Sequence, residues 1–406
     1  MKTLYVFDDY QLSLNNGVGT YIKELTRLID DMEDVRMVMI MLRSNVKESS
    51  VYICNNMEYI LFPKSETENS FRDTISIIAL LQKHINDTID NIFLFNYTPC
   101  NYLLCKLASE FPLSKRISVV HDFNWTTYFK GNISLFNKYI IKYKKEDNIY
   151  KTIKQIYLSE KEQYFNSDKI ICLSEDAYMI LKVFYGISIE KIILIPHGIK
   201  QNRLKNNLLQ KDKLRLLYGI DKSEKIILSV GRISEAKGTF VLLEALKELQ
   251  LTELKFRWVI VGDLKNMEDL LIKAGNLVTK MIFTGYINKK TLMQLYKMAD
   301  VGILSSYTEQ CSYVGLEMMN CGLPIVATDA IGIRCMFKNG INACISPIKN
   351  TKKTNLLKKN LLKSILLVLN NPTLQIKLKL NGYRILKEKY SYNSMKEKYN
   401  TLFQTI

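Results

Sequence analysis

The chain has 406 residues, 47% of them hydrophobic, which is enough for two domains of ordinary size, each with a buried core. The formal net charge is +17, from 57 basic and 40 acidic residues, so an anionic membrane, an anionic acceptor or a nucleic acid is a conceivable partner. No apolar run reaches the roughly 18 residues of a membrane helix. The eight cysteines form no CxxC pair, which argues against a zinc site or a disulfide framework.

Predicted strands and helices alternate along the chain, which favours an α/β fold with parallel sheets and crossover helices. Apolar runs predict strands at 4–7, 35–42, 92–95, 117–120, 169–173 and 192–195, and then at 225–230, 258–261, 281–283, 301–304 and 324–328. The stretch 200–213 is polar and separates these two groups. We therefore expect a first domain over 1–200, a second over 201–385, and a C-terminal helix within 386–406 that packs back on the first domain.

The first predicted strand leads into a glycine-containing turn, from Asn15 to Ile22, that opens a helix. Such a turn lets the backbone approach a phosphate group, so Gly17 and Gly19 are candidate phosphate-binding residues. A dinucleotide-binding fingerprint would need a third glycine where Ile22 stands, and the turn has no Gly-Lys-Ser/Thr sequence. Neither a dinucleotide site nor a Walker loop is predicted here.

His121 and Asp122 directly follow the predicted strand 117–120, at the end of a parallel strand where catalytic groups gather. A single histidine is more often structural, so position alone does not assign it a role. His197, in a Pro-His-Gly turn near the expected domain boundary, is predicted to be structural. The stretch 129–165 is rich in Tyr and Lys, helical in pattern, and matches no recognition motif.

The run 225–238 predicts a buried strand that ends at Gly231, then a loop with two cations, Arg232 and Lys237, then a helix that begins near Thr239. Two fixed positive charges beside a helix N-terminus make a phosphate site. Gly285 and Tyr286 lie in the loop directly after the strand 281–283.

Glu309 and Glu317 lie eight residues apart, between the predicted strands 301–304 and 324–328. Glu309 falls in the loop after the first of these strands, and Glu317 falls on the helix that follows. Carboxylates in such a loop can accept hydrogen bonds from sugar and ribose hydroxyls. The simpler interpretation is a helix-terminus charge and a solvated surface glutamate. The neighbouring motifs decide between the two.

These motifs together resemble the retaining glycosyltransferases of the GT-B fold, family 4. The loop from Gly231 to Gly238 is similar to the family's G-R-x4-K-G loop, and the pair Glu309 and Glu317 is similar to its E-x7-E signature. Cys321 to Thr328 continues the resemblance, with the family's C-G-x-P-V-x-A-T. The similarities in the first domain are looser: His121-Asp122 with H-D, and the turn before Gly19 with G-G-x-G, where Asn16 replaces the first glycine.

The resemblance implies two Rossmann-like, doubly wound parallel-sheet domains that face each other across a cleft. It implies that Arg232 and Lys237 stabilise the departing diphosphate, that Glu309 binds the transferred sugar, and that Glu317 binds the ribose. The implied catalytic residues are His121, Glu309, Arg232 and Lys237. The implied donor-binding residues are Gly17, Gly19, Arg232, Lys237, Gly285, Tyr286, Glu309, Cys311, Ser312 and Glu317.

One departure from the family bears on specificity. Gln310, Cys311 and Ser312 stand where the family has Gly-aromatic-Gly. The backbone amides can still serve the donor, but the pocket around the transferred sugar is reshaped. The sequence therefore leaves the donor sugar open.

The resemblance implies a hexosyltransferase-type enzyme that works with retention of anomeric configuration. The donor is expected to be a UDP- or GDP-sugar, and the acceptor a glycan, a lipid-linked sugar or a peptide, in surface polysaccharide or glycoconjugate synthesis. Neither a metal nor another cofactor is expected, because Arg232 and Lys237 would neutralise the leaving group.

Three other functions stay open. One is a non-catalytic GT-B protein that binds a sugar nucleotide or a partner. Another is a basic nucleic-acid-binding protein, although no motif for RNA or DNA is present. The last keeps the fold and changes the reaction, as in an epimerase or a phosphorylase.

The expected location is cytoplasmic, because the N-terminal apolar stretch is too short for a signal peptide. Between Lys349 and Lys398 there are 13 basic residues and two acidic ones. Lysines in such a run usually form a solvated surface of the protein. The excess of basic residues also motivates the hypothesis that the protein attaches to the inner surface of an anionic membrane. No nucleic-acid partner is expected.

Overall fold

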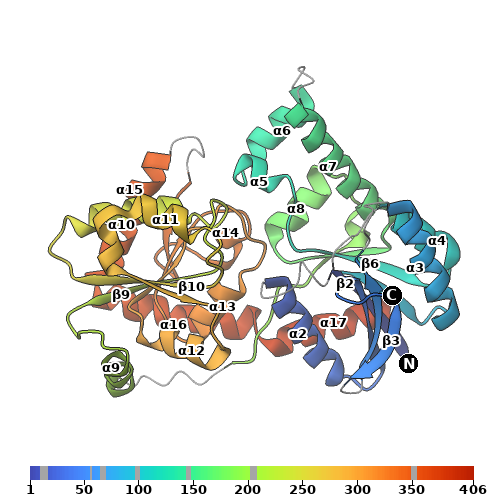
Figure 1. Ribbon diagram of the computed structural model, residues 1–406, viewed down its shortest axis with the longest axis horizontal. Helices are drawn as coiled ribbons and strands as arrows, with labels where there is room; N and C mark the ends of the chain where they lie inside the picture. The colour runs from blue at the N-terminus through green and yellow to red at the C-terminus, as the bar shows by residue number, and fades with distance from the viewer. Residues whose placement is uncertain are drawn as a thin grey trace. The chain divides into compact units, whose positions relative to one another are not determined.

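The computed structural model describes residues 1–9, 17–54, 57–64, 70–96, 101–142, 148–201, 208–348 and 354–406, which fall into two compact units (Figure 1). The first unit comprises Met1–Trp125, Ser134–Pro196 and Met395–Ile406. The second comprises Thr126–Ile133 and His197–Ser394. The units divide after Pro196 and after Ser394, where boundaries after residues 200 and 385 were expected. In addition, Thr126–Ile133, from the first half of the chain, belongs to the second unit.

The first unit is built on an eight-stranded sheet with the order β3-β4-β2-β1-β5-β6-β7-β8. Among the described strand pairs of this sheet, β3–β4 is antiparallel and the others are parallel. The strands are β1 (Lys2–Asp9), β2 (Val35–Ser44), β3 (Ser50–Cys54), β4 (Met57–Pro63), β5 (Asn91–Phe95), β6 (Lys115–Val120), β7 (Lys169–Cys172) and β8 (Ile192–Leu194). The six predicted strands of this half are confirmed. The hairpin β3–β4 was missed, because all five residues of β3 are exposed and form no buried run.

The first unit also contains helices, several of which pack on this sheet (Figure 1). They are α2 (Gly17–Asp30), α3 (Ser70–His84), α4 (Asn101–Glu110), α6 (Ile133–Lys142), α7 (Asn148–Asn166), α8 (Glu175–Val183) and α17 (Tyr392–Thr405), with the 3-10 helix η1 (Ile189–Lys191). The C-terminal helix α17 packs in the first unit, where the Tyr399 hydroxyl contacts the Tyr21 hydroxyl of α2.

An aromatic cluster fills one face of the first sheet. Tyr5 and Phe7 of β1 pair in register with Phe93 and Phe95 of β5, and alternate residues of a strand share a face. The Phe7 and Phe93 rings meet edge to face with centroids 5.7 Å apart, and Phe93 meets Phe111 in the same way at 5.3 Å. Such contacts add to the burial of the rings themselves.

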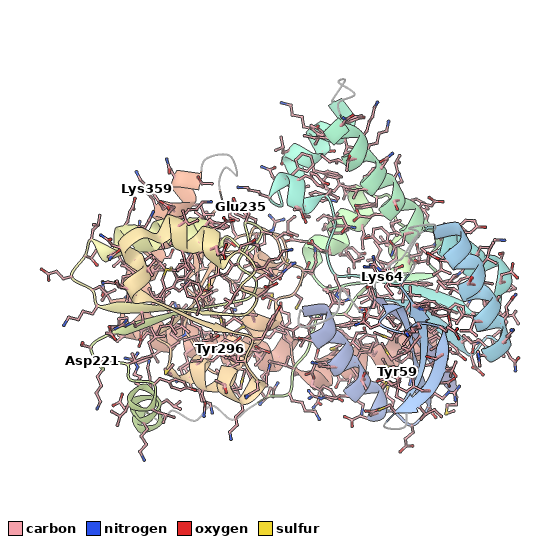
Figure 2. The ribbon with its side chains drawn as sticks, in the orientation of Figure 1. Tyr59, Lys64, Asp221, Glu235, Tyr296 and Lys359 are labelled. Atoms are coloured by element: carbon pink, nitrogen blue, oxygen red, sulfur yellow. The ribbon has the colours of Figure 1, made fainter. Side chains whose placement is uncertain are left out.

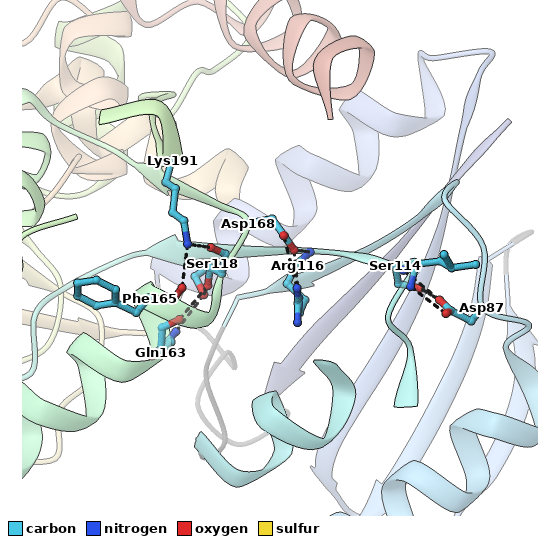
Figure 3. Close-up of polar contacts among 10 residues, drawn as sticks. Asp87, Ser114, Arg116, Ser118, Gln163, Phe165, Asp168 and Lys191 are labelled. Carbon is cyan, nitrogen blue, oxygen red and sulfur yellow. Dashed lines mark hydrogen bonds and ion pairs between the residues drawn. The ribbon is translucent and has the colours of Figure 1, made fainter. Parts of the chain in front are cut away.

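Polar side chains fix the loops at the amino ends of β6 and β7 (Figure 3). The Arg116 Nε donates to Asp168 Oδ2 at 3.0 Å, and the Arg116 backbone N–H donates to the same oxygen at 2.8 Å. Nearby, the Ser114 hydroxyl donates to Asp87 Oδ1 at 2.6 Å. These bonds set the placement of β6 and so of His121, which follows its other end.

Glu160 of α7 is buried against the loop that follows β6. Its Oε1 accepts the Asn124 backbone N–H at 2.7 Å, and its Oε2 accepts the Tyr185 hydroxyl, which itself accepts Trp125 Nε1–H at 3.1 Å. Burial raises the pKa of Glu160 to about 7, from an ordinary value of 4.5. The hydrogen bonds from Tyr185 and Asn124 oppose that shift in pKa, and the charge of Asp122 adds to it.

Glu160→Gln is expected to stabilise the first unit at pH 8 and to change it little at pH 4.5. A carboxyl whose pKa is raised on folding contributes stability that is present below its unfolded pKa and lost as the pH rises through its folded pKa, here about 7. The gain at pH 8 should be roughly 1–3 kcal/mol. Urea unfolding of both proteins at the two pH values measures it, and an equal effect at both would contradict the assignment.

The second unit is built on a six-stranded sheet with the order β11-β10-β9-β12-β13-β14, and all its described pairs are parallel. The strands are β9 (Lys225–Val230), β10 (Phe256–Val261), β11 (Met281–Gly285), β12 (Val301–Leu304), β13 (Ile325–Thr328) and β14 (Cys344–Ser346). The five predicted strands are confirmed. The three-residue β14 was missed because its apolar run is too short to recognise.

The helices of the second unit are α5 (Thr126–Phe129), α9 (Leu208–Leu217), α10 (Thr239–Gln250), α11 (Met267–Ala274), α12 (Lys289–Met298), α13 (Tyr313–Asn320), α14 (Ile333–Met336), α15 (Thr354–Leu369) and α16 (Pro372–Lys389), with the 3-10 helix η2 (Gly275–Lys280). Trp258 of β10 lies fully buried in the core, where its Nε1–H donates to Ser229 Oγ at 2.9 Å.

Apolar residues recur at helical spacing over residues 355–369, a pattern that is typical of a helix with one face in the core. α15 buries Leu357, Leu361, Ile365 and Val368 in the same hydrophobic cluster as Trp258. Within the described ranges, no helix is both long and apolar enough to cross a membrane.

Candidate active site

The loop between β9 and α10 carries the two predicted phosphate-binding cations. Gly238 has φ +66°, and a Cβ there would stand well within 3.0 Å of the Ser305 carbonyl oxygen, so the close approach of these two loops requires glycine. The Ser234 N–H donates to Thr239 Oγ1, and the Lys237 N–H donates to Ser234 Oγ, each at 3.3 Å. Thr239 is the first residue of the helix α10, and Gly238 occupies the N-cap position.

Lys237 and Glu309 are brought together by the fold. Their ammonium and carboxylate groups form an ion pair, and the Ser306 hydroxyl donates to the same Glu309 oxygen at 3.2 Å. The Glu309 backbone N–H donates to Ile331 O at 3.2 Å, which fixes the loop after β12. The two residues come from loops that follow neighbouring strands, β9 and β12, at their carboxyl ends.

Arg232 is exposed in the same loop as Lys237, and over the described ranges no hydrogen bond or ion pair engages its side chain. Tyr286, after β11, is 57% exposed. Burial and the charge of Asp263 raise the pKa of the Tyr286 hydroxyl, and the Arg232 charge opposes this shift. Arg232, Tyr286 and Glu309 therefore follow three strands of one sheet at its carboxyl edge, where ligands bind in α/β folds.

Glu317 lies on α13 and is 7% exposed. Its Oε2 accepts the Tyr296 hydroxyl at 2.8 Å, and its Oε1 forms an ion pair with Lys289. Both partners come from α12 (Figure 2 labels Tyr296). Tyr296 and Lys289 were not predicted as site residues, because nothing in their local pattern indicates which carboxylate the helix will meet.

The residues that depart from the family pattern have local structural partners. The Ser312 hydroxyl caps α13 by accepting the Gly315 N–H at 3.3 Å. The Cys311 carbonyl accepts His197 Nδ1–H at 2.8 Å, and the His197 ring stacks on Tyr313 with centroids 4.1 Å apart. Burial lowers the pKa of His197 to about 4, so this ring is neutral at pH 7.

In the first unit, His121 belongs to a hydrogen-bonded chain at the carboxyl ends of the adjacent strands β1, β5 and β6. Its Nε2–H donates to Asn96 Oδ1 at 2.5 Å, and Asn96 Nδ2 donates to Asp8 Oδ1 at 2.8 Å. The Tyr21 ring meets the His121 ring edge to face at 4.9 Å. These hydrogen bonds fix the orientation of the His121 ring. They were not predicted, because they depend on the order of the strands in the sheet.

Gly17 and Gly19 lie in the first turn of α2, so both are helical rather than part of a preceding loop. Asn15 and Asn16, which complete the predicted turn, lie outside the described residues. Over the described ranges, no cluster of three or more His, Cys, Asp or Glu side chains could hold a metal ion.

Comparison with known proteins finds a family match in the second half of the chain. Residues 210–384 match the model of a family described as glycosyl transferases group 1. An uncharacterized glycosyltransferase of Methanocaldococcus jannaschii is 29% identical over 244 residues, which cover 56% of this chain and 61% of the relative. Alpha-monoglucosyldiacylglycerol synthase of Streptococcus pneumoniae is 33% identical over 165 residues, covering 39% of this chain and 37% of the relative. The chain thus matches less than two thirds of the length of either relative.

The fold is similar to solved structures over the whole chain. For sucrose-phosphate synthase of Thermosynechococcus elongatus the TM-score is 0.77 at 16% identity, with coverage of 100% of this chain and 98% of that one. For HepE of Anabaena in complex with UDP and glucose the TM-score is 0.70 at 15% identity, with full coverage of both. At these identities the likeness shows the fold, which confirms the predicted class.

Proposed function

We propose that this chain, whose residues 210–384 match the group 1 glycosyl transferases and which has the GT-B fold, transfers a sugar from a nucleotide-sugar to an acceptor with retention of anomeric configuration. One observation carries the proposal. Lys237 and Glu309 meet as an ion pair at the carboxyl edge of the second sheet. A cation and a carboxylate in one place can serve the diphosphate and the sugar hydroxyls of a single donor.

Loss of the nucleoside diphosphate develops negative charge on its phosphate oxygens. Arg232 and Lys237 would neutralise that charge in the transition state. Lys237 would exchange its partner Glu309 for the phosphate, and the freed Glu309 carboxylate would accept hydrogen bonds from the sugar and position its anomeric carbon. Glu317, which the hydrogen bond from Tyr296 already orients, would accept hydrogen bonds from the ribose hydroxyls.

His121 is proposed to act near the transferred sugar. Its Nε2–H is committed to Asn96, which leaves the ring orientation set before any substrate arrives. The amino end of α2, with Gly17 and Gly19, is proposed to face the donor phosphates through its backbone N–H groups.

A UDP- or GDP-sugar is the proposed donor, and a glycan, lipid-linked sugar or peptide is the proposed acceptor in surface polysaccharide or glycoconjugate synthesis. HepE of Anabaena was solved with UDP and glucose, which supports the nucleotide-sugar class. Two relatives are named for lipid-bearing products: alpha-monoglucosyldiacylglycerol synthase and lipopolysaccharide 1,2-N-acetylglucosaminetransferase of Salmonella typhimurium. They support a lipid-linked acceptor.

The first experiment is a thermal-shift panel of UDP-, GDP-, ADP- and CDP-sugars in buffer with EDTA. A donor that binds the folded protein raises its unfolding temperature. Sugars of one nucleotide should raise this temperature more than the sugars of the other three. The proposed metal independence requires that the shift survive EDTA. Absence of a shift with every donor, with or without added Mg²⁺, would contradict the donor site and favour a non-catalytic scaffold.

We also propose that the basic C-terminal region attaches the protein to an anionic membrane surface. The apolar face of α15 is used in the core, but α16 exposes Ile376 and Leu380 on the same helical face as Arg384 and Lys387. Co-sedimentation with phosphatidylglycerol vesicles should exceed that with phosphatidylcholine vesicles and fall with salt. Equal recovery with both vesicles would reject the proposal.

A further inference from the structure

The segment Thr126–Ile133 comes from the first half of the chain and belongs to the second unit. It consists of α5 and a tight turn at Lys130 and Gly131, with φ values of 47° and 69°. Lysine rarely adopts a positive φ, and such a backbone persists only where its surroundings require it. The two residues are therefore held by what they contact.

Lys130 and Gly131 contact the two loops that carry the candidate donor site. Lys130 Nζ lies 2.5 Å from Glu235 Oε1, in the loop after β9, and 4.9 Å from the centroid of the Tyr307 ring, in the loop after β12. A Cβ on Gly131 would stand well within 3.0 Å of the Tyr307 carbonyl oxygen. Two consecutive residues thus touch both loops at once.

These two loops are also bonded to each other. The Tyr307 N–H donates to the Ala236 carbonyl at 2.9 Å, and the Ser305 hydroxyl donates to the Lys237 carbonyl at 2.8 Å. A shift at Glu235 or Tyr307 would therefore reach Lys237 directly, and Lys237 in turn pairs with Glu309.

Glu235 is an acidic residue inside a loop that is proposed to bind a diphosphate. It stands between Arg232 and Lys237 in the sequence, and 54% of its side chain is exposed (Figure 2 labels Glu235). An unpaired carboxylate there would repel the donor through Coulomb interaction. The ammonium of Lys130 neutralises that carboxylate.

We propose that Lys130 is a positioning residue of the donor site, which neutralises Glu235 and, with Gly131, sets the phosphate loop against the loop of Glu309. This inference rests on the proposed function, because the site it supports is the diphosphate site. In this proposal neither Lys130 nor Gly131 contacts the donor.

The test is a double-mutant cycle read out as affinity for a free nucleoside diphosphate. UDP, GDP, ADP and CDP are first titrated into the wild-type protein by calorimetry, and the tightest is used with Lys130→Ala, Glu235→Gln and the double variant. Lys130→Ala should raise Kd about five-fold. Glu235→Gln should bind the diphosphate at least as tightly as the wild-type protein does. The Kd of the double variant should lie within two-fold of the wild-type Kd.

The unfolding temperature separates this role from a structural one. The Lys130–Glu235 pair is 29% and 54% exposed, and such pairs contribute little to stability. Lys130→Ala should therefore weaken diphosphate binding without lowering Tm. If the double variant binds as weakly as Lys130→Ala, the neutralisation of Glu235 is wrong.

Gly131→Ala tests the second contact, and Gly340→Ala is its matched control. Both glycines have positive φ, 69° and 67°, but nothing lies within 4 Å of a Cβ built on Gly340. Both substitutions strain the backbone, whereas only Gly131→Ala pushes on Tyr307, so only it should raise Kd. Equal Kd values for the two would overturn the positioning role of Gly131.

The failure of this inference is distinguishable from failure of the proposed function. If the wild-type protein binds none of the four diphosphates, the donor site itself is wrong, and the role of Lys130 falls with it. If the wild type binds one and Lys130→Ala binds it equally well, the donor site stands and only the role of Lys130 is rejected.

Discussion

Arg232→Ala and Glu309→Gln should each lower kcat for sugar transfer by roughly 100- to 1,000-fold, the usual effect of removing one group that stabilises transition-state charge. Arg232 is proposed to supply positive charge to the departing diphosphate. Within the part of the chain that the structure describes, the Glu309 side chain bonds to Lys237 and Ser306, so its loss should leave the fold intact. The measurement is the rate of nucleoside diphosphate release with the donor chosen by the thermal-shift panel.

Arg257→Ala is the matched control for Arg232→Ala. Arg257 lies in β10 near its amino end, and its Nε donates to Glu224 Oε1 at 2.9 Å. In a parallel sheet that end is opposite the ligand-binding edge. Arg257→Ala should keep kcat within about two-fold. If Arg232→Ala does the same while remaining folded, Arg232 has no part in catalysis.

Asp300→Ala should destabilise the second unit by about 3–5 kcal/mol, because it leaves a buried positive charge without its partner. Asp300 accepts the Ile226 N–H at 2.7 Å and Lys211 Nζ at 2.8 Å, and it pairs with Arg215, whose side chain is only 4% exposed. Arg215 also donates to the Glu224 carbonyl at 2.8 Å. This cluster attaches α9 to the sheet.

Two further variants make the Asp300 prediction specific. Lys211→Ala removes the more exposed partner and should cost about 1 kcal/mol or less. Replacing both Arg215 and Asp300 by apolar residues of similar size should recover much of the loss, because no charge is then left buried. Asp300→Ala would contradict the prediction if it cost no more than Lys211→Ala.

The two tryptophans make this measurement possible in a chain of two units, where a single unfolding transition cannot be assumed. Trp125 belongs to the first unit, and Trp258 is buried in the second. A Trp125→Phe background leaves Trp258 as the fluorescent reporter. Urea titrations in that background therefore follow the unit that contains Asp300.

The sequence predicts the parts of the fold that depend on local burial. β9 and β12 appear where mostly apolar runs predicted them, because strands of a parallel sheet are covered on both faces. The helical spacing of Leu357, Leu361 and Ile365 likewise indicates a face that packs in the core, where the structure places these residues. β3 could not be found in this way, since its exposed side chains carry no such pattern.

The candidate site was predictable only in part. The loops of Arg232, Lys237 and Glu309 were placed from strand ends and spacing, and the ion pair between Lys237 and Glu309 fits that placement. Partners from distant parts of the chain were not predictable. Asn96 meets His121 only because β5 and β6 are neighbours in the sheet. The catalytic roles themselves stay predictions.

The division of the chain also constrains the order in which the protein can fold as it is synthesised. The first unit contains Met395–Ile406, and the hydroxyl of Tyr399 from that segment meets Tyr21 of α2. Domains commonly fold one by one from the N-terminus as the ribosome makes them. Here the N-terminal sheet is made first, yet its last helix is translated only after the entire second unit. Until that helix is made, the nascent first unit lacks the contact of Tyr399 with Tyr21, whereas the second unit already has all its segments.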